Sequence, residues 1–123
     1  MRLQAATVMV TAVGAALGAP SRYLVDAALR ARWGSRLPWG TLAVNLAGSA
    51  AAGVVAGLRP GGVLTALLAT GFLGAFTTAS TLVAELGELA RSGWWPAVGL
   101  LALHVGPGLL LAGTGLAVGR ALA

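Results

Sequence analysis

Four apolar stretches, each long enough to cross a bilayer as a helix, make up almost the whole chain. They are separated by charged residues or by clusters of proline and glycine, and they cover residues 3–29, 39–58, 63–90 and 95–122. A transmembrane helix needs about 20 mostly apolar residues. Only 9% of the 123 residues are charged, against about 25% in a soluble domain. We therefore expect an all-α integral membrane protein, with one domain over residues 1–123 and four antiparallel spans.

The composition excludes several classes of function. The chain has no cysteine, one histidine and three acidic residues, so disulfides, thiolate chemistry and most acid–base catalysis lack the residues they need. We therefore predict that the protein is not an enzyme. The net charge of +5 comes from arginine, and no basic run is longer than the spaced set Arg30, Arg32 and Arg36. Such arginines anchor loops at a membrane surface, so membrane lipid is the expected partner and nucleic acid is not.

Small residues recur at helical spacing in three of the four stretches. The ladders are Gly14 and Gly18; Ser49, Gly53 and Gly57; and Gly115 and Gly119. They let helix backbones approach closely where no hydrophobic effect drives association. Packing within the chain is the simpler interpretation, and a seam between subunits is the alternative. Four thin helices form little wall for a membrane pathway, so we expect an oligomer of identical or homologous subunits.

The arginines outside the spans are almost evenly divided between the two sides of the membrane. The termini and the second loop share one side, with Arg2, Arg59 and Arg120; the opposite side has Arg30, Arg32, Arg36 and Arg91. An excess of Lys and Arg on one side normally sets orientation, and here the excess is a single residue. A chain that inserts in both orientations would show this balance, and a fixed topology set by subtler features is the alternative.

The third stretch contains the densest group of polar residues. Four hydroxyls lie within five residues, between two glycines and a glutamate: Gly71, Gly74, Thr77, Thr78, Ser80, Thr81 and Glu85. Such hydroxyls can bond back to their own helix, but with glycine and β-branched residues at this depth they favour a broken helix. Irregular backbone in a bilayer is tolerated only when it is buried in protein or lines a polar cavity. Carbonyls freed at such a break can coordinate a cation.

Several other polar residues lie inside or near the spans. Asn45, with Ser49 one turn later on the same face, either bonds a neighbouring helix or donates to an anion. Arg22 lies one turn from Asp26, which suggests either an ion pair or a cationic vestibule that concentrates anions. His104 forms a bond across helices in the simpler interpretation, and the alternatives are that it titrates or lines the path. Glu85 and Glu88 share a face, where we expect interfacial solvation or pairing with Arg91; a pair that couples the movement of cations or protons is the alternative.

Three motifs, in order along the chain, resemble those of the Fluc (CrcB) family of fluoride channels. They are Gly18-Ala19 with Arg22-Tyr23; Gly40-Thr41-Leu42 with Val44-Asn45 and Gly48; and Gly71-Phe72 with Gly74, Thr77-Thr78, Ser80-Thr81 and Glu85. The resemblance covers essentially the whole chain, and the motif of the third stretch is specific. A fluoride pore must replace tightly held water with convergent donors, such as amides, hydroxyls and ring edges, and these residues are compatible with that need.

The resemblance implies a channel that exports fluoride passively from the cytoplasm through the cell membrane and so reduces its toxicity. It implies a dual-topology dimer, in which two antiparallel copies enclose two fluoride pores. A structural sodium ion would be held by the backbone carbonyls of Gly74 and Thr77. The resemblance places these side chains in the pathway: Asn45, Ser80 and Thr81 facing the pore, and Arg22 in a vestibule.

Four positions depart from the family pattern. The family typically has phenylalanines, whose ring edges face the ions, at the pore-lining positions held here by Ala79 and Leu82. A small hydroxyl of the fourth span has become Gly108, and His104 stands where a polar residue, often asparagine, is expected. Phe72 or Phe76 would be the nearest aromatic substitute, although each lies several residues from the family position.

The missing aromatic residues leave several hypotheses open. The chain forms an active homodimer with weakened conduction, or it is one subunit of a heterodimer, with little activity alone, whose homologous partner supplies the rings. A scaffold subunit that transports nothing is a third possibility. A small multidrug-type exporter is a fourth, but it requires a membrane-embedded carboxylate as proton carrier. The first span offers only Asp26, near its end and close to Arg22.

Overall fold

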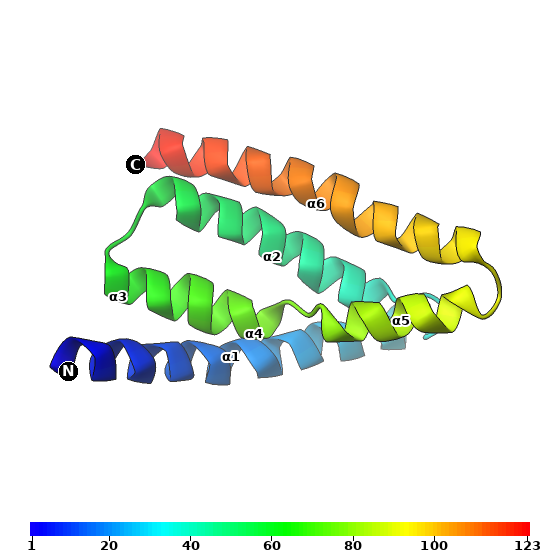
Figure 1. The fold of residues 1–123 in the computed structure, drawn as a ribbon, viewed down its shortest axis with the longest axis horizontal. Coiled ribbons are helices and arrows are strands. Elements are labelled where there is room, and N and C mark those ends of the chain that lie inside the picture. The colour runs from blue at the N-terminus through cyan, green and yellow to red at the C-terminus, as the bar shows by residue number, and fades with distance from the viewer.

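The fold is entirely helical. The structure is a computed structural model that describes residues 1–123, and three of its spans are single helices: α1 (Arg2–Trp33), α2 (Trp39–Leu58) and α6 (Trp94–Leu122). Together with Gly62–Ala90, these are four segments long and apolar enough to cross a membrane. Figure 1 shows that consecutive spans run in opposite directions and that both termini lie at the same end of the bundle. The predicted all-α class with four spans is confirmed.

The third span is broken near its middle. Its first half consists of α3 (Gly62–Thr65), a π-helical segment over Ala66–Leu73 and the short α4 (Gly74–Phe76), and its second half is α5 (Ser80–Ala90). Between the halves the backbone of Thr77 is extended, with φ −81° and ψ 161°. The predicted break is therefore confirmed. The π-helical segment before it was not predicted, because its sequence differs little from that of an ordinary apolar helix.

Each of the three connections between spans contains a residue with positive φ, and the third is Gly93, with φ 142°. Gly34, with φ 78°, ends α1, and its N–H donates to the carbonyl of Arg30. Arg59, with φ 52°, ends α2 in the left-handed conformation, and its N–H donates to the carbonyl of Val55. Pro60 follows directly and cannot continue the helix. These short turns keep consecutive spans adjacent and antiparallel.

Two glycine seams hold the helices together. In the first, Gly14 and Gly18 of α1 lie against the backbone of the π-helical segment, so that a Cβ on Gly14 would come within 2.8 Å of the Phe72 nitrogen. In the second, glycines of α2 and α6 face one another, and a Cβ on Gly57 would come within 2.7 Å of the Arg120 nitrogen. For these ladders the interpretation as packing within the chain is confirmed.

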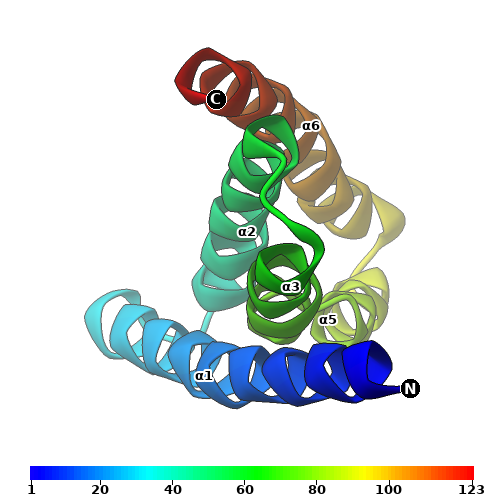
Figure 2. The same cartoon turned by 90° about the vertical axis from the view of Figure 1, so that its left-hand side faces the viewer.

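The arrangement leaves much apolar surface uncovered. In the end view of Figure 2, α2 and the third span lie between α1 on one side and α6 on the other. Only 18 of the 123 residues are buried, and aliphatic side chains such as Leu110 (74% exposed) and Val83 (66% exposed) face outward. Such a surface suits hydrocarbon or another apolar helix and is unsuited to water.

Candidate ion pathway

Asn45 holds the break in the third span together from outside. Its Nδ2 donates to the carbonyl of Thr78 at 2.9 Å, and its Oδ1 accepts the N–H of Thr78 at 2.8 Å. Thr78 is 8% exposed, so its backbone groups could not be left unpaired without a large free-energy cost. One amide on α2 thus replaces the two backbone hydrogen bonds that Thr78 would form in a continuous helix.

The threonine hydroxyls of the break bond to one another and to nearby backbone. Thr78 Oγ1 donates to Thr81 Oγ1 at 3.0 Å, lies 3.3 Å from Ser80 Oγ, and accepts the N–H of Thr81 at 3.3 Å. Thr77 Oγ1 donates to the carbonyl of Leu73 at 3.0 Å. Thr78 therefore helps to start α5, and Thr77 stabilises the end of α4.

Several carbonyls at the break lose the donors that a continuous helix would provide, and those of Gly74 and Thr77 are among them. In an α-helix the N–H of Thr78 would reach the carbonyl of Gly74, and that of Thr81 would reach Thr77. Here the N–H of Thr78 donates to Asn45 and that of Thr81 donates to the Thr78 hydroxyl. Both carbonyls that the resemblance assigns to sodium are thus among those that have lost their helical donors.

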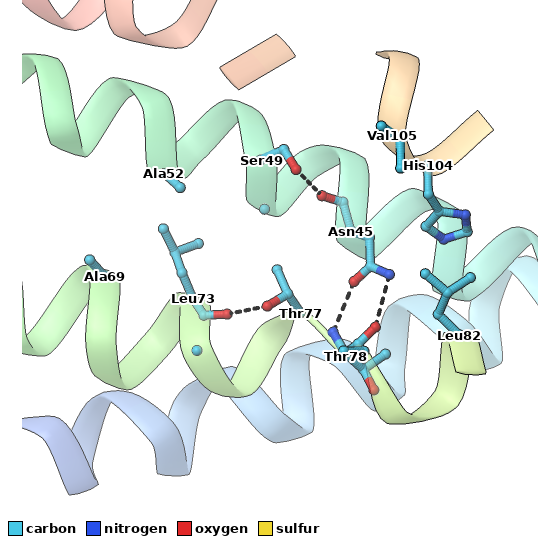
Figure 3. A pocket seen from close by; sticks show the side chains of 13 residues that line it. Asn45, Ser49, Ala52, Ala69, Leu73, Thr77, Thr78, Leu82, His104 and Val105 are labelled. Carbon is cyan, nitrogen blue, oxygen red and sulfur yellow. Dashed lines mark hydrogen bonds between the residues drawn. The ribbon is translucent and has the colours of Figure 1, made fainter. Parts of the chain in front are cut away.

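A groove of about 490 Å³ runs along one side of the break, between α2, the third span and α6. Figure 3 shows the side chains that reach it from these three elements. Ser49 and Asn45 both line it, so the prediction that they share a face is confirmed, but the Ser49 hydroxyl donates to the carbonyl of Asn45 at 2.8 Å. The lining residues are Asn45, Gly48, Ser49, Ala52, Ala69, Leu73, Gly74, Thr77, Thr78, Ala79, Leu82, His104 and Val105.

A smaller cavity, of about 200 Å³, lies on the other side of the break, and we call it the Arg22 cavity. Its lining residues are Arg22, Tyr23, Asp26, Arg30, Gly40, Thr41, Val44, Thr78 and Thr81. Thr78 lines both spaces, so the clamped segment separates the groove from the Arg22 cavity. Asp26 forms its ion pair with Arg30, at 2.6 Å, and not with Arg22. The guanidinium of Arg22 is left without a carboxylate partner.

The two glutamates of α5 have different partners. Glu85 Oε1 accepts a hydrogen bond from Thr41 Oγ1 at 2.6 Å, and its Oε2 is buried without a partner. Glu88 lies 4.0 Å from Arg91, and both side chains are exposed. The expected solvation or pairing with Arg91 therefore holds for Glu88 and is wrong for Glu85. Arg91 is three residues from Glu88, on the same face, but six residues from Glu85, on another.

His104 projects from α6 into the wall of the groove. Its Nδ1 lies 3.0 Å from the carbonyl of Leu100, one turn earlier on the same helix. The residue is only 8% exposed, and its Nε2 is buried and has no hydrogen-bond partner. The bond expected across helices is thus wrong, because one ring nitrogen contacts its own helix and the other has no partner.

The residues predicted for the pathway are divided between the two spaces. Asn45, Gly74, Thr77, Ala79 and Leu82 line the groove, whereas Arg22 and Thr81 line the Arg22 cavity. Ser80 lines neither space and lies beside the hydroxyl of Thr78. Their roles in conduction stay predictions.

Sequence reasoning missed two residues that organise this region, Thr78 and Thr41. Thr78 receives the clamp from Asn45, and Thr41 binds Glu85. Both belong to the motifs quoted above. Their adjacency to Thr77 and Gly40 was the available signal, but it did not show which of the neighbouring hydroxyls faces a partner helix.

Four membrane spans, with a hydroxyl-rich break that separates two cavities, define a multi-pass membrane protein of the channel or transporter class. Residues 9–116 match the family described as CrcB-like protein, Camphor Resistance (CrcB). The chain belongs to this family, and the resemblance seen in its motifs is confirmed.

Three curated relatives cover nearly the full length of the chain. A protein of Rhodospirillum centenum, named fluoride-specific ion channel FluC, is 39% identical over 120 residues, which are 94% of this chain and 93% of the relative. The protein of the same name from Roseiflexus sp. is 42% identical over 119 residues, 93% of this chain and 95% of the relative. Fluoride-specific ion channel FluC 1 of Symbiobacterium thermophilum is 46% identical over 114 residues, 87% and 92% of the two chains.

Proposed function

We propose that this protein is a fluoride-specific channel through which the ion leaves the cytoplasm passively, along the break in the third span. Its membership of the CrcB family and the names of its relatives support this function. The protein is accordingly a channel and not an enzyme, since no bond is made or broken. The observation that carries the pathway is the amide clamp between Asn45 and Thr78. It stabilises an irregular segment whose polar groups face the spaces on both sides.

The donors along the break suit a small, strongly hydrated anion. Arg22, which has no carboxylate partner, would raise the local concentration of anions at the entrance. Thr81 lines the same cavity as Arg22, and the hydroxyl of Ser80 lies 3.3 Å from that of Thr78, which borders both spaces. One N–H of the Asn45 amide is engaged by Thr78, and the second is left to donate to the ion. Such convergent donors would replace the water that fluoride loses.

A second copy of the chain would complete the pathway. The groove is walled by α2, the third span and α6, and a copy in the opposite orientation would cover it. The near balance of arginines at the two ends of the bundle supports insertion in both orientations. Two antiparallel copies would then enclose two symmetric pores, with membrane lipid around them.

A structural sodium ion would fit the break of such a dimer. The carbonyls of Gly74 and Thr77 have lost their helical donors to Asn45 and Thr78, and freed carbonyls of unwound helices coordinate sodium in transporters. Each copy would contribute two oxygens. The ion would add positive charge beside the anion pathway, while the residues of the chain keep the break in place.

A heterodimer is the second candidate assembly, and the lining of the groove favours it. No aromatic side chain lines the groove, where Ala79 and Leu82 contribute a methyl and an isobutyl group. Phe72 and Phe76 stack on one another, with centroids 5.7 Å apart, and neither lines the groove. A homologous subunit would then supply the ring edges, and this chain alone would have little activity.

A small multidrug-type exporter is less well supported. Such a mechanism needs a carboxylate inside the membrane that exchanges protons with the substrate. Asp26 is held by Arg30 at 2.6 Å near the end of α1. Glu85 is the other inward carboxylate, and its Oε1 is bound by Thr41. Neither faces the groove.

Fluoride efflux from proteoliposomes tests the function and the assembly together. We expect efflux of fluoride without efflux of chloride, and we expect Leu82→Phe to increase the rate if missing rings limit conduction. Thr114→Ala is the matched control, because Thr114 is exposed and donates only to its own helix. Efflux from this chain alone would support a homodimer, and efflux only with a co-reconstituted homologue would support the heterodimer. No efflux in either preparation would overturn the channel.

Replacing sodium by a large organic cation on both sides of the vesicle tests the ion at the break. We expect loss of efflux and a lower temperature of thermal unfolding, because the freed carbonyls would face one another without a charge between them. Potassium and lithium arms separate a specific site from an effect of ionic strength. Unchanged efflux and stability in all three cations would exclude the sodium site.

A further inference from the structure

Among the side-chain polar atoms of the residues that line the groove, His104 Nε2 is the one that is buried without a hydrogen-bond partner. His104 is the only histidine of the chain. Its Nδ1 lies 3.0 Å from the carbonyl of Leu100. A carbonyl oxygen only accepts, so Nδ1 must carry the hydrogen. The neutral ring therefore exists as the Nδ1–H tautomer, and Nε2 has a lone pair and no hydrogen.

The protonation state of the ring thus decides whether Nε2 accepts or donates a hydrogen bond. A neutral His104 presents an acceptor, which repels an anion and offers it no hydrogen bond. A protonated His104 keeps the bond from Nδ1 to Leu100 and gains an N–H and a positive charge at Nε2. Hydrogen bonds between two charged groups are among the strongest in proteins. The fixed tautomer makes this change complete, because no rearrangement of the neutral ring can place a hydrogen on Nε2 while the bond to Leu100 remains.

The titratable groups of the neighbouring helices lie outside the groove. Figure 3 shows the ring between Asn45 of α2 and Leu82 of α5, and neither of these side chains titrates. Glu85 of α5 is a titratable side chain whose Oε1 is held by Thr41 of α2. On α1, Asp26 and Arg30 lie with Glu85 along a separate cavity. No other titratable side chain lines the groove.

We propose that His104 is an anion ligand of the groove that works only when it is protonated, so that fluoride passes faster as the pH falls. The inference rests on the proposed function, since it names a further residue of the same pathway. In the neutral state the groove would hold the Nε2 lone pair against the ion. In the protonated state Nε2–H would join the free N–H of Asn45, across the groove, as a second donor.

The first test is the pH profile of fluoride efflux from proteoliposomes. Protein-free vesicles at each pH supply the correction for hydrogen fluoride that crosses the lipid unaided. We expect the corrected rate to rise about tenfold from about pH 8.5 to about pH 5.5, with one titration, because one hydrogen bond to a charged group is gained. His104→Gln, which does not titrate, should give a flat profile, whereas Thr114→Ala on the same helix should keep the profile of the natural chain.

Three results would overturn the proposal. They are a flat profile in the natural chain, a rate that falls on acidification, or a slope that survives in His104→Gln. The variant Glu85→Gln tests whether Glu85, and not His104, is the titrating group. If Glu85 were itself the titrating group, its substitution would abolish the slope in a chain that retains His104. We expect the slope to persist.

Nuclear magnetic resonance of ¹⁵N-histidine gives a second measurement that does not require transport. Because the chain has one histidine, the spectrum contains a single pair of ring signals. We expect the Nδ1–H tautomer at high pH, and a shift of the Nε2 signal by sodium fluoride only below the midpoint of the titration. The Nε2–H tautomer, or an Nε2 signal that ignores fluoride at low pH, would refute the assignment. Absence of efflux at every pH would contradict the proposed function, and this spectrum would still decide the role of His104.

Discussion

The glycine seams and the break solve one problem in opposite ways. Backbone groups inside a bilayer must find partners within the protein. At the seams the helices are continuous, each satisfies its own backbone, and glycines let two of them touch. At the break the helix is interrupted, and a side chain of another helix supplies the missing bonds. At the seams no backbone polar group is left without a partner. The break leaves carbonyls, hydroxyls and one N–H of Asn45 beside two cavities.

This difference explains how so few polar residues can support transport. The seams form a frame of close backbone contacts at glycines, in which α1 packs against the first half of the third span and α2 packs against α6. The break lies between the two seams and borders open space on both sides. A substitution in a seam should therefore destroy the fold, whereas a substitution at the break should change conduction in proportion to the bonds it removes.

The largest effect is expected from Gly115→Val. A Cβ at Gly115 would collide with the carbonyl oxygen of Ala50 and come within 3.0 Å of the Val54 nitrogen. Neither atom can move without separating α2 from α6. We expect the protein to lose its monodisperse peak in size-exclusion chromatography.

Gly113→Val is the matched control, because a Cβ at Gly113 meets nothing within 4 Å. This variant should retain the peak and lose at most about 1 kcal/mol, the range of helix propensity differences. If both variants behaved alike, close approach of the backbones would not be what holds the seam.

The second largest effect is expected from Asn45→Ala. It leaves the N–H and the carbonyl of Thr78 unpaired, and each buried orphan costs about 1–3 kcal/mol. We expect a lower temperature of thermal unfolding in detergent and a loss of fluoride efflux. Thr78→Val is the companion variant, because it removes the hydroxyl and keeps the backbone clamp. A greater loss of stability in Thr78→Val than in Asn45→Ala would show that the clamp is not the main support of the break.

A smaller effect is expected from Thr41→Val, which has the same shape and lacks the hydroxyl. It removes the 2.6 Å hydrogen bond to Glu85, and hydrogen bonds to charged groups contribute about 1.5–3 kcal/mol. The control is Thr7→Val, since Thr7 is exposed and donates only to the carbonyl of Leu3. Chemical unfolding of the two variants compares them directly. Equal stability would mean that Glu85 finds another partner.

The smallest effect is expected from Ser49→Ala. Ser49 lines the groove, but its hydroxyl donates to the carbonyl of Asn45 in its own helix. Such back-bonding contributes little to stability, so we expect a change below about 1 kcal/mol and a nearly unchanged efflux rate. A large fall in efflux with unchanged stability would instead make Ser49 an anion donor and extend the polar strip along α2.

The break could be predicted from the sequence, but the hydrogen-bond partners of its residues could not. Glycines, β-branched residues and four neighbouring hydroxyls disfavour a continuous helix over Thr77–Thr81, whatever surrounds them. The choice of Thr78 as the residue that Asn45 binds depends on how far α2 and the third span are rotated and shifted. The same holds for Asp26, which had two arginines within reach and pairs with Arg30.

The sequence alone determined the number of spans, the class of fold and the place of the break, because the bilayer allows so few ways to bury a backbone. Its motifs also indicated the family. The tertiary structure decided which polar atoms form hydrogen bonds within the protein and which stay without a partner. Asn45 has one N–H to spare, Gly74 and Thr77 keep unshared carbonyls, and His104 keeps a bare nitrogen. Which atoms stay without a partner depends on contacts between helices far apart in sequence. The proposed pathway for ions is formed by these atoms.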